Sequence, residues 1–318
     1  SPPPMDSGWT EAVLGQEWSG RDKYLWLTCD LEFPAQWNGR QLVGLFDFGV
    51  TGSCSTYGFE ALLYVDGVPF QGVDTHHQEV YFPEHFAGRT VPVVFRLWSG
   101  LEGGGVPRIM THVFRQAETA WLDESVDQLY YAGRMILETL PLLSDNDPVR
   151  TALRNTLNQA LLEVDWRDEG STSFHASVQT AWGTLDRLLN SMDKQSVVDL
   201  VCVGHTHIDV AWLWRYKHTR EKSARSFSTV LRLMEQYPEY TFLQSQPQLY
   251  EYIKNDFPEI YEGIRQKIRE GRWEVDGGMW IEADCNIPSG ESLTRQILVG
   301  TRFTEKEFGT RMHYLWLP

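Results

Sequence analysis

The chain has 318 residues, of which 42% are hydrophobic and 22% charged, a composition typical of folded globular proteins that build more than one core. A formal net charge of -15 argues against nucleic acid as a partner, because proteins that bind phosphate backbones need a basic surface. No apolar run approaches the roughly 20 residues that span a bilayer, so we expect no membrane contact.

The cysteines and the first residues bear on the compartment. Cys29, Cys54, Cys202 and Cys285 are scattered and form no CxxC pair. The opening "SPPPMDSGW" has neither the basic nor the apolar region of an export signal. Both features predict a soluble protein in the reducing cytoplasm.

Residues 1–118 are predicted to form an antiparallel β-sandwich. Apolar residues recur at every second position, as over residues 25–33, which is the period of half-buried strands. In "YVDGVPF", Asp66 and Gly67 stand between two apolar runs and predict a two-residue hairpin turn. Glycine and proline punctuate the rest of this segment, as they do in all-β domains.

Residues 119–195 are predicted to be a helical connector. Apolar residues follow helical spacing in three stripes, over residues 122–140, 149–164 and 178–192. Asp147 precedes Pro148, which predicts a helix that begins there with the aspartate as its N-cap.

Residues 196–318 are predicted to alternate strands with helices in a parallel α/β sheet or barrel. The run "VVDLVCVG" is typical of a strand buried on both faces. Further strands are expected at "YTFLQS", "RWEVDGGMW" and "MHYLWLP", with helices over residues 219–236, 247–269 and 289–308. Reactive groups of such domains gather at the carboxyl ends of the strands.

Two strand ends carry side chains suited to chemistry. His205, His207 and Asp209 follow the first strand at alternate positions, so their side chains can converge, and imidazole with carboxylate is a ligand set suited to zinc and similar divalent ions. The alternative to a metal site is that these three side chains are ordinary hydrogen-bonded polar groups at the end of a strand.

The second strand end is "DGGMWIEADCN". Gly277 and Gly278 allow the backbone to bend or approach closely, and Glu282 and Asp284 place two carboxylates at the strand's mouth. A carboxylate at this position can complete a metal site, act as a nucleophile, or do both; a solvated loop is the alternative reading.

The stretches "GHTHIDVAWLW", "GGMWIEADCNIPSGESLTRQ" and "YLWLP" together resemble glycoside hydrolase family 38, the retaining α-mannosidases, and most of all their cytosolic and bacterial branch. The resemblance covers residues 201–318 in detail and implies that residues 196–318 are the first part of a parallel β/α barrel-like catalytic domain. The strand-rich segment before it is similar in kind to the accessory N-terminal domain of that branch.

The resemblance implies roles for single residues. His207 and Asp209 match paired metal ligands, and Asp284 matches a carboxylate that both touches the metal and attacks the anomeric carbon. Trp212 matches the aromatic side chain under the sugar, whereas core packing is favoured for Trp214. The implied substrate is a mannose-containing oligosaccharide and the implied cofactor a divalent metal, zinc foremost. The linkage, the native metal and the oligomeric state, a homo-oligomer included, stay open.

In the family, an acid that contributes to protonating the leaving group follows "WLP", and a further metal-binding histidine lies far downstream. The resemblance therefore predicts that these residues are the N-terminal portion of an α-mannosidase and are inactive alone. Alternatives are an amidohydrolase-like or metallo-β-lactamase-like metal hydrolase, or a carbohydrate-binding module without catalysis. Val210 occupies the last ligand position of the metallo-β-lactamase pattern HxHxDH, and amidohydrolases need further histidines at later strand ends.

Overall fold

The computed structural model describes residues 8–49, 58–101, 106–192 and 198–318. By their contacts they fall into two compact units. One unit comprises Ser1–Gln36, Val43–Ala120 and Val201–Pro318, and the other comprises Trp37–Leu42 and Trp121–Leu200. The predicted domain boundaries after residues 118 and 195 stay predictions.

Among the described residues, nine strands build the sandwich of the first unit. Their order is β2-β7-β4-β5 in one sheet, β6-β3-β9 in a second and β1-β8 in a third, and the pairs β2-β7, β7-β4, β4-β5 and β1-β8 are antiparallel. The predicted antiparallel sheets are therefore confirmed. The strands are β1 (Glu17–Gly20), β2 (Tyr24–Phe33), β3 (Gln41–Asp47), β4 (Glu60–Val65), β5 (Val68–Asp74), β6 (Glu79–Phe82), β7 (Arg89–Trp98), β8 (Met110–Val113) and β9 (Gln116–Leu122). Three short 3-10 turns also occur in the chain, η1 (Ala35–Trp37), η2 (Glu84–Phe86) and η3 (Leu140–Leu142).

Phenylalanine rings fill the space between the sheets. The ring of Phe95 lies 4.8 Å from that of Phe46 and 4.9 Å from that of Phe48, and all three side chains are buried. The predicted hairpin joins β4 to β5, with Asp66 at φ 50° and Gly67 at φ 77°. These positive φ values match the twist of a two-residue hairpin turn, which explains the Asp-Gly pair.

In its described part, the second unit contains the helices α1 (Glu124–Thr139), α2 (Pro148–Leu161) and α3 (Thr172–Ser191). Asp147 caps α2 as predicted, because its side chain accepts a hydrogen bond from the backbone N–H of Val149. The apolar stripe predicted over residues 122–140, which included Tyr130 and Leu137, is wrong in part. Tyr130 and Leu137 are exposed, whereas Ile136 joins the buried core of this unit, since the helix turns its 129-133-136 face inward.

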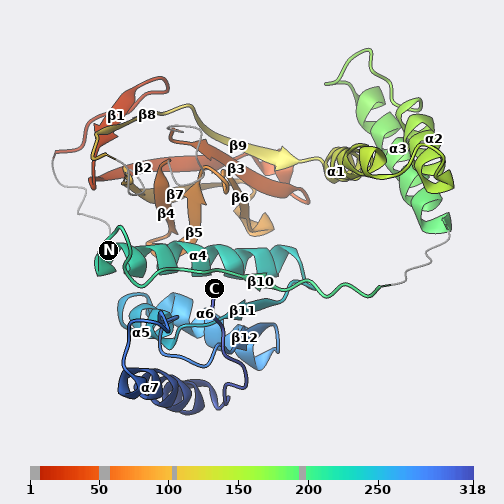
Figure 1. Ribbon diagram of the computed structural model, residues 1–318. Helices are drawn as coiled ribbons and strands as arrows, with labels where there is room; N and C mark the ends of the chain where they lie inside the picture. The colour runs from red at the N-terminus through yellow and green to blue at the C-terminus, as the bar shows by residue number, and fades with distance from the viewer. Residues whose placement is uncertain (1–7, 50–57, 102–105, 193–197) are drawn as a thin grey trace. The chain divides into compact units, whose positions relative to one another are not determined.

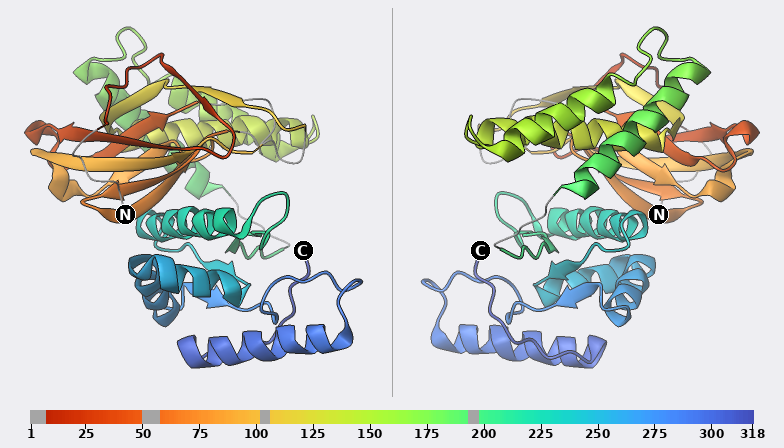
Figure 2. Two further views of the ribbon diagram at one scale, coloured as in Figure 1. Left: turned by 90° about the vertical axis from the view of Figure 1, so that its left-hand side faces the viewer. Right: turned by 90° about the vertical axis from the view of Figure 1, so that its right-hand side faces the viewer.

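The rest of the first unit alternates short parallel strands with helices. The strands are in the order β10-β11-β12, and both pairs are parallel. Figure 2 shows α4 on one side of this sheet and α7 on the other. Three strands do not close a barrel, so the barrel-like architecture stays a prediction. The elements are β10 (Gly204–His205), α4 (Tyr216–Gln236), β11 (Phe242–Gln244), α5 (Pro247–Asp256), α6 (Pro258–Arg269), β12 (Trp273–Val275) and α7 (Gly290–Phe308).

Three predictions for this segment are wrong. The strand predicted at "MHYLWLP" is reduced to one isolated parallel bridge, between Leu315 and Gly277. The run at residues 197–204 is not a buried strand in its described part, since Val198, Leu200 and Val201 are 70%, 87% and 86% exposed. In the described chain, β10 begins at Gly204, so residues 198–203 precede the first strand of the parallel sheet. The helix predicted over residues 247–269 is two helices, because Pro258 cannot continue a helix from α5.

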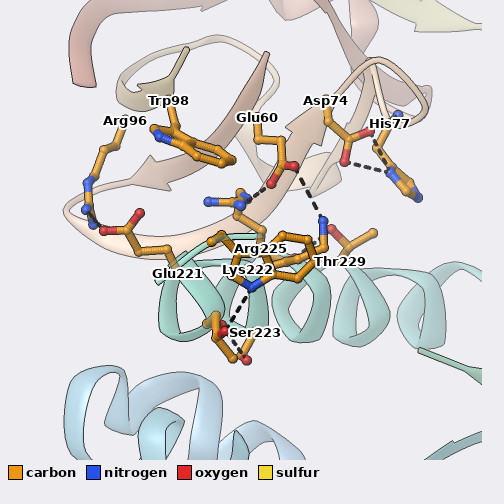
Figure 3. A network of polar contacts seen from close by, with 12 residues as sticks. Glu60, Asp74, His77, Arg96, Trp98, Glu221, Lys222, Ser223, Arg225 and Thr229 are labelled. Carbon is orange, nitrogen blue, oxygen red and sulfur yellow. Dashed lines mark hydrogen bonds and ion pairs between the residues drawn. The ribbon is translucent and has the colours of Figure 1, made fainter. Parts of the chain in front are cut away.

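Helix α4 lies along the sheet β2-β7-β4-β5 (Figure 1) and joins it through one apolar core and a layer of polar contacts (Figure 3). Leu62 and Tyr64 of β4 pack in the same core as Phe227 of α4. The backbone N–H of Gly72 donates to Thr229 Oγ1 at 3.1 Å. The sandwich thus rests directly on the helix that follows the first parallel strand.

Gly72 has a steric role in this contact. A Cβ atom at this position would lie 2.9 Å from the carbonyl oxygen of Arg225 and 2.9 Å from Thr229 Oγ1. We therefore expect Gly72→Ala to lower the free energy of unfolding by about 1–3 kcal/mol, the usual cost of an extra methyl group in a packed contact. Gly290→Ala is the control, because nothing lies within 4 Å of its Cβ position. Urea unfolding of both variants measures this, and equal stabilities would contradict the packing argument.

No helix among the described residues is long and apolar enough to cross a membrane.

Candidate functional site

The loop between β10 and α4 carries most of the predicted site residues. His207 Nε2 lies 3.2 Å from Asp209 Oδ1, so the structure brings these two predicted ligands together. Their side chains are 39% and 38% exposed, which leaves both within reach of a ligand from solvent.

The other ring nitrogen of His207 contacts a buried carboxylate. Its Nδ1 pairs with Glu282, which follows β12 and whose side chain is only 2% exposed. Ser245, at the end of β11, donates its hydroxyl to the same carboxylate. When Glu282 accepts the Nδ1 proton, the Nε2 lone pair of His207 faces the Asp209 side. This arrangement is typical of histidines that bind metals, whose second nitrogen commonly donates to a carboxylate.

Three buried side chains hold the backbone of this loop. Gln244 donates to the carbonyl oxygen of residue 206 at 3.2 Å, and Gln246 donates to that of Ile208 at 2.9 Å. Thr219, in the first turn of α4, donates to the carbonyl oxygen of Asp209 at 2.9 Å. Sequence reasoning missed these residues. For Gln244 and Gln246 the signal is the polar "QSQ" that ends an otherwise apolar strand, because buried amides need partners.

The two tryptophans of the loop have different surroundings. The indole Nε1–H of Trp214 donates to Thr219 Oγ1 at 3.0 Å, which ties this ring to the base of α4. Trp212 is 57% exposed, and its ring meets that of Trp214 edge-on with centroids 5.4 Å apart. Trp214 therefore has a structural role in the loop, and the ring of Trp212 is accessible to a ligand.

Asp284 lies apart from this pair in its contacts. Its side chain is exposed, and Oδ1 accepts a hydrogen bond from the backbone N–H of Asn286 at 2.6 Å. Within the described residues, no group of three or more His, Cys, Asp or Glu side chains is placed to hold a metal ion. The structure thus joins His207 and Asp209, with Glu282 behind them, and does not join Asp284 to them.

The end of the chain runs beside β12. Leu315 forms a parallel bridge with Gly277, whose φ of 118° suits a residue without a side chain. A Cβ atom on Gly277 would lie 2.5 Å from that of Ser245, so the glycine allows the site strands to approach. Trp316 brings its ring centroid to 4.7 Å from that of His205. Burial lowers the pKa of His205, in keeping with a neutral ring that packs against an indole.

A residue of the sandwich holds the start of α4. Asp22 accepts hydrogen bonds from His218 Nε2 at 2.6 Å, Lys217 Nζ at 3.0 Å and Trp98 Nε1 at 3.1 Å, and it also pairs with Arg215. Burial raises the pKa of Asp22, but these donors outweigh it and lower the pKa to about 2. Burial lowers the pKa of His218, so a neutral ring faces an ionised carboxylate.

Asp22 therefore makes stability depend on acid pH. The pKa of this carboxyl group is near 4 in the unfolded chain, so its contribution to stability is complete above about pH 5 and is lost as the pH falls towards 2. We expect Asp22→Asn to be about 2 kcal/mol less stable at pH 7, with a difference that shrinks between pH 5 and pH 2. Asp30→Asn, on an exposed position of β2, is the control. Denaturant unfolding from pH 5 to pH 2 measures the difference in free energy of unfolding between the wild type and each variant. A difference for Asp22→Asn that stays constant with pH contradicts the role of the ionised carboxylate.

Two family descriptions match the chain. Residues 197–318 match "Glycosyl hydrolases family 38 N-terminal domain", and residues 4–92 match "Alpha-mannosidase, jelly roll domain". The first covers every element from β10 to α7, and the second agrees with the antiparallel sheets of the sandwich.

Proteins similar to this chain carry α-mannosidase names. The chain is 29% identical over 323 residues to "Alpha-mannosidase G" of Dictyostelium discoideum, an alignment that covers 96% of this chain and 28% of that relative. It is 30% identical over 307 residues to "Alpha-mannosidase 2C1" of Homo sapiens, an alignment that covers 92% of this chain and 28% of that relative. It is 42% identical over 127 residues to an "Alpha-mannosidase" of Saccharomyces cerevisiae, an alignment that covers 40% of this chain and 12% of that relative. The chain spans at most 28% of the length of these three relatives.

Proposed function

This chain belongs to glycosyl hydrolase family 38, and on that premise we propose that the protein containing it removes α-linked mannose from oligosaccharides with retention of configuration. The observation that carries the proposal is the contact between His207 and Glu282, which joins the carboxyl ends of two parallel strands. Reactive groups of parallel β/α domains meet at these ends.

A divalent metal, zinc foremost, is part of the proposal. The donor chemistry of His207 and Asp209 fits such an ion, and the carboxylate behind His207 orients the ring as in known metal sites. Asp284 is the proposed third ligand, but its described position does not bring it into this group. A bound divalent ion would hold neighbouring hydroxyl groups of mannose and favour a flattened ring.

The reaction itself is proposed to run through Asp284. Its carboxylate attacks the anomeric carbon, the glycosidic C–O bond breaks, and the leaving oxygen takes a proton from a general acid. Water then breaks the glycosyl ester, so two inversions leave the α configuration unchanged. The open face of Trp212 is proposed to stack against the C–H surface of the sugar and orient it.

Hydrolysis by the natural protein that contains these residues tests the function. An aryl α-mannoside is the substrate, and the matching aryl β-mannoside is the control that should not react. Proton NMR of the first product is expected to show α-mannose. No release from the α-mannoside contradicts the function, and β-mannose as the first product excludes a covalent role for Asp284.

A cytoplasmic location is also a proposal. It is supported by Cys29, Cys202 and Cys285, which are free among the described cysteines. A non-catalytic carbohydrate-binding module is the alternative function. The site at the strand ends disfavours it, because a binding sandwich alone has no need of the loop that His207 and Asp209 occupy.

A further inference from the structure

A cavity of about 300 Å³ lies beside the candidate site, between the β10–α4 loop and the sandwich. Asp209, Trp212 and Trp214 line it from the loop. The cavity thus adjoins the proposed mannose position and shares Asp209 and Trp212 with it. Its volume lies at the lower end of the range for small-molecule pockets, which suits a single sugar unit.

The loop supplies an aromatic wall. Trp212 is more than half exposed, and Trp214 holds it edge-on from behind. Trp214 is itself fixed by its hydrogen bond to Thr219. An aromatic face held in place by packing binds the C–H surface of a sugar at little entropic cost, since few torsions remain to be ordered.

The sandwich and α4 supply a charged wall (Figure 3). Glu60 of β4 points at α4, where it pairs with Arg225 and lies 3.4 Å from Lys222 Nζ. The Glu60 and Arg225 side chains are only 25% and 9% exposed, so both hold a defined geometry. Charged groups of this kind make strong hydrogen bonds with hydroxyl groups.

The charges around the cavity balance. Glu60 and Asp209 oppose Lys222 and Arg225, and burial lowers the pKa of the fifth titratable neighbour, His218, so that it is neutral. A cavity with no excess of either sign does not favour a phosphate or carboxylate ligand. Aromatic and balanced charged walls together favour a neutral polyhydroxylated ligand.

We propose that this cavity is a second sugar subsite, which the sandwich and the loop build together. It binds the unit of an oligosaccharide that is linked to the mannose at Asp209 and Trp212. The inference rests on the proposed function. It gives the sandwich a part in substrate selection, because Glu60 reaches the cavity from the sandwich.

Lys222 and Lys217 offer a matched pair of substitutions on α4. Lys222 lines the cavity, Lys217 does not, and their side chains are 39% and 41% exposed. Lys222→Met removes one contact of Glu60, which keeps its pair with Arg225. Lys217→Met removes one contact of Asp22, which keeps its pair with His218. Differences in folding between the two variants should therefore be small.

The test compares a disaccharide with a substrate that has no second sugar. In the natural protein, Lys222→Met is expected to lower the ratio of kcat/KM for α-mannobiose to that for an aryl α-mannoside about 10-fold, the effect of losing a hydrogen bond to a charged group. Lys217→Met should leave this ratio as in the wild type. An equal loss on both substrates, or no loss, overturns the subsite.

Direct binding separates failure of the subsite from failure of the proposed function. If the wild type hydrolyses neither substrate, the function fails, and calorimetric titration with α-mannobiose still tests the cavity. Binding weakened about 10-fold in Lys222→Met supports the subsite. Equal binding by both proteins, or none by the wild type, overturns it. Leu101→Trp, which places a large ring in the cavity, should weaken binding without touching any ion pair.

Discussion

Replacing Asp284 by asparagine is expected to lower kcat for an aryl α-mannoside by on the order of 10,000-fold or more, because a group that forms the covalent intermediate has no substitute in the site. Asparagine keeps the size of the side chain and can still accept the hydrogen bond from the backbone of Asn286. The loss would therefore reflect the missing nucleophile and not a changed loop.

Asp168→Asn is the matched control for this variant. Asp168 is also exposed, and it accepts a hydrogen bond from the backbone N–H two residues later, at Gly170. It lies in the helical unit and should keep full activity. Azide offers a second readout with Asp284→Gly, since a small external nucleophile can enter the vacated space and give a mannosyl azide of inverted configuration. Substantial residual activity in Asp284→Asn would remove this residue from the reaction.

Replacing His207 by alanine is expected to lower the divalent metal bound by the natural protein about 10-fold or more, the scale for loss of a ligand or its close support. The ring lies between Asp209 and Glu282, so its removal takes away one donor and leaves the buried Glu282 carboxylate without its ring partner. Elemental analysis of the purified protein measures the metal content, with activity recorded in parallel.

His175→Ala controls for the loss of any histidine paired with a carboxylate. His175 Nδ1 lies 2.6 Å from Asp123 in the helical unit, and its side chain is 38% exposed against 39% for His207. This variant should keep its metal. Unchanged metal content in His207→Ala would show that the loop is not a metal site, whatever the effect on activity.

The candidate site depends on contacts that reach far along the chain. Asp22 and Glu60 come from the sandwich, yet they bind residues at the start and along the length of α4. The first turn of α4 in turn holds Asp209 through Thr219. Substitutions in the sandwich that move α4 are therefore expected to shift the loop that carries Asp209. This agrees with the part in substrate selection proposed for Glu60.

Sequence alone determined the elements that short-range chemistry specifies. The Asp66-Gly67 turn and the Asp147-Pro148 helix start are where they were predicted, because both depend on φ values and hydrogen bonds within a few residues. The parallel order of the last strands was also predictable from the alternation of strand and helix patterns. Periodicity likewise predicted that His207 and Glu282 follow strands of the same parallel sheet, which are β10 and β12 on either side of β11.

Only the tertiary structure decided which polar groups meet. His207 and Glu282 are 75 residues apart, and Asp22 and His218 are 196 apart, so no local pattern could pair them. The same reason explains the errors: residues 198–203 carry a strand-like pattern, but burial requires a neighbour that the pattern does not specify. The role of a side chain at this site depends on the polar group that it contacts. The packing of segments far apart in the sequence determines which group that is.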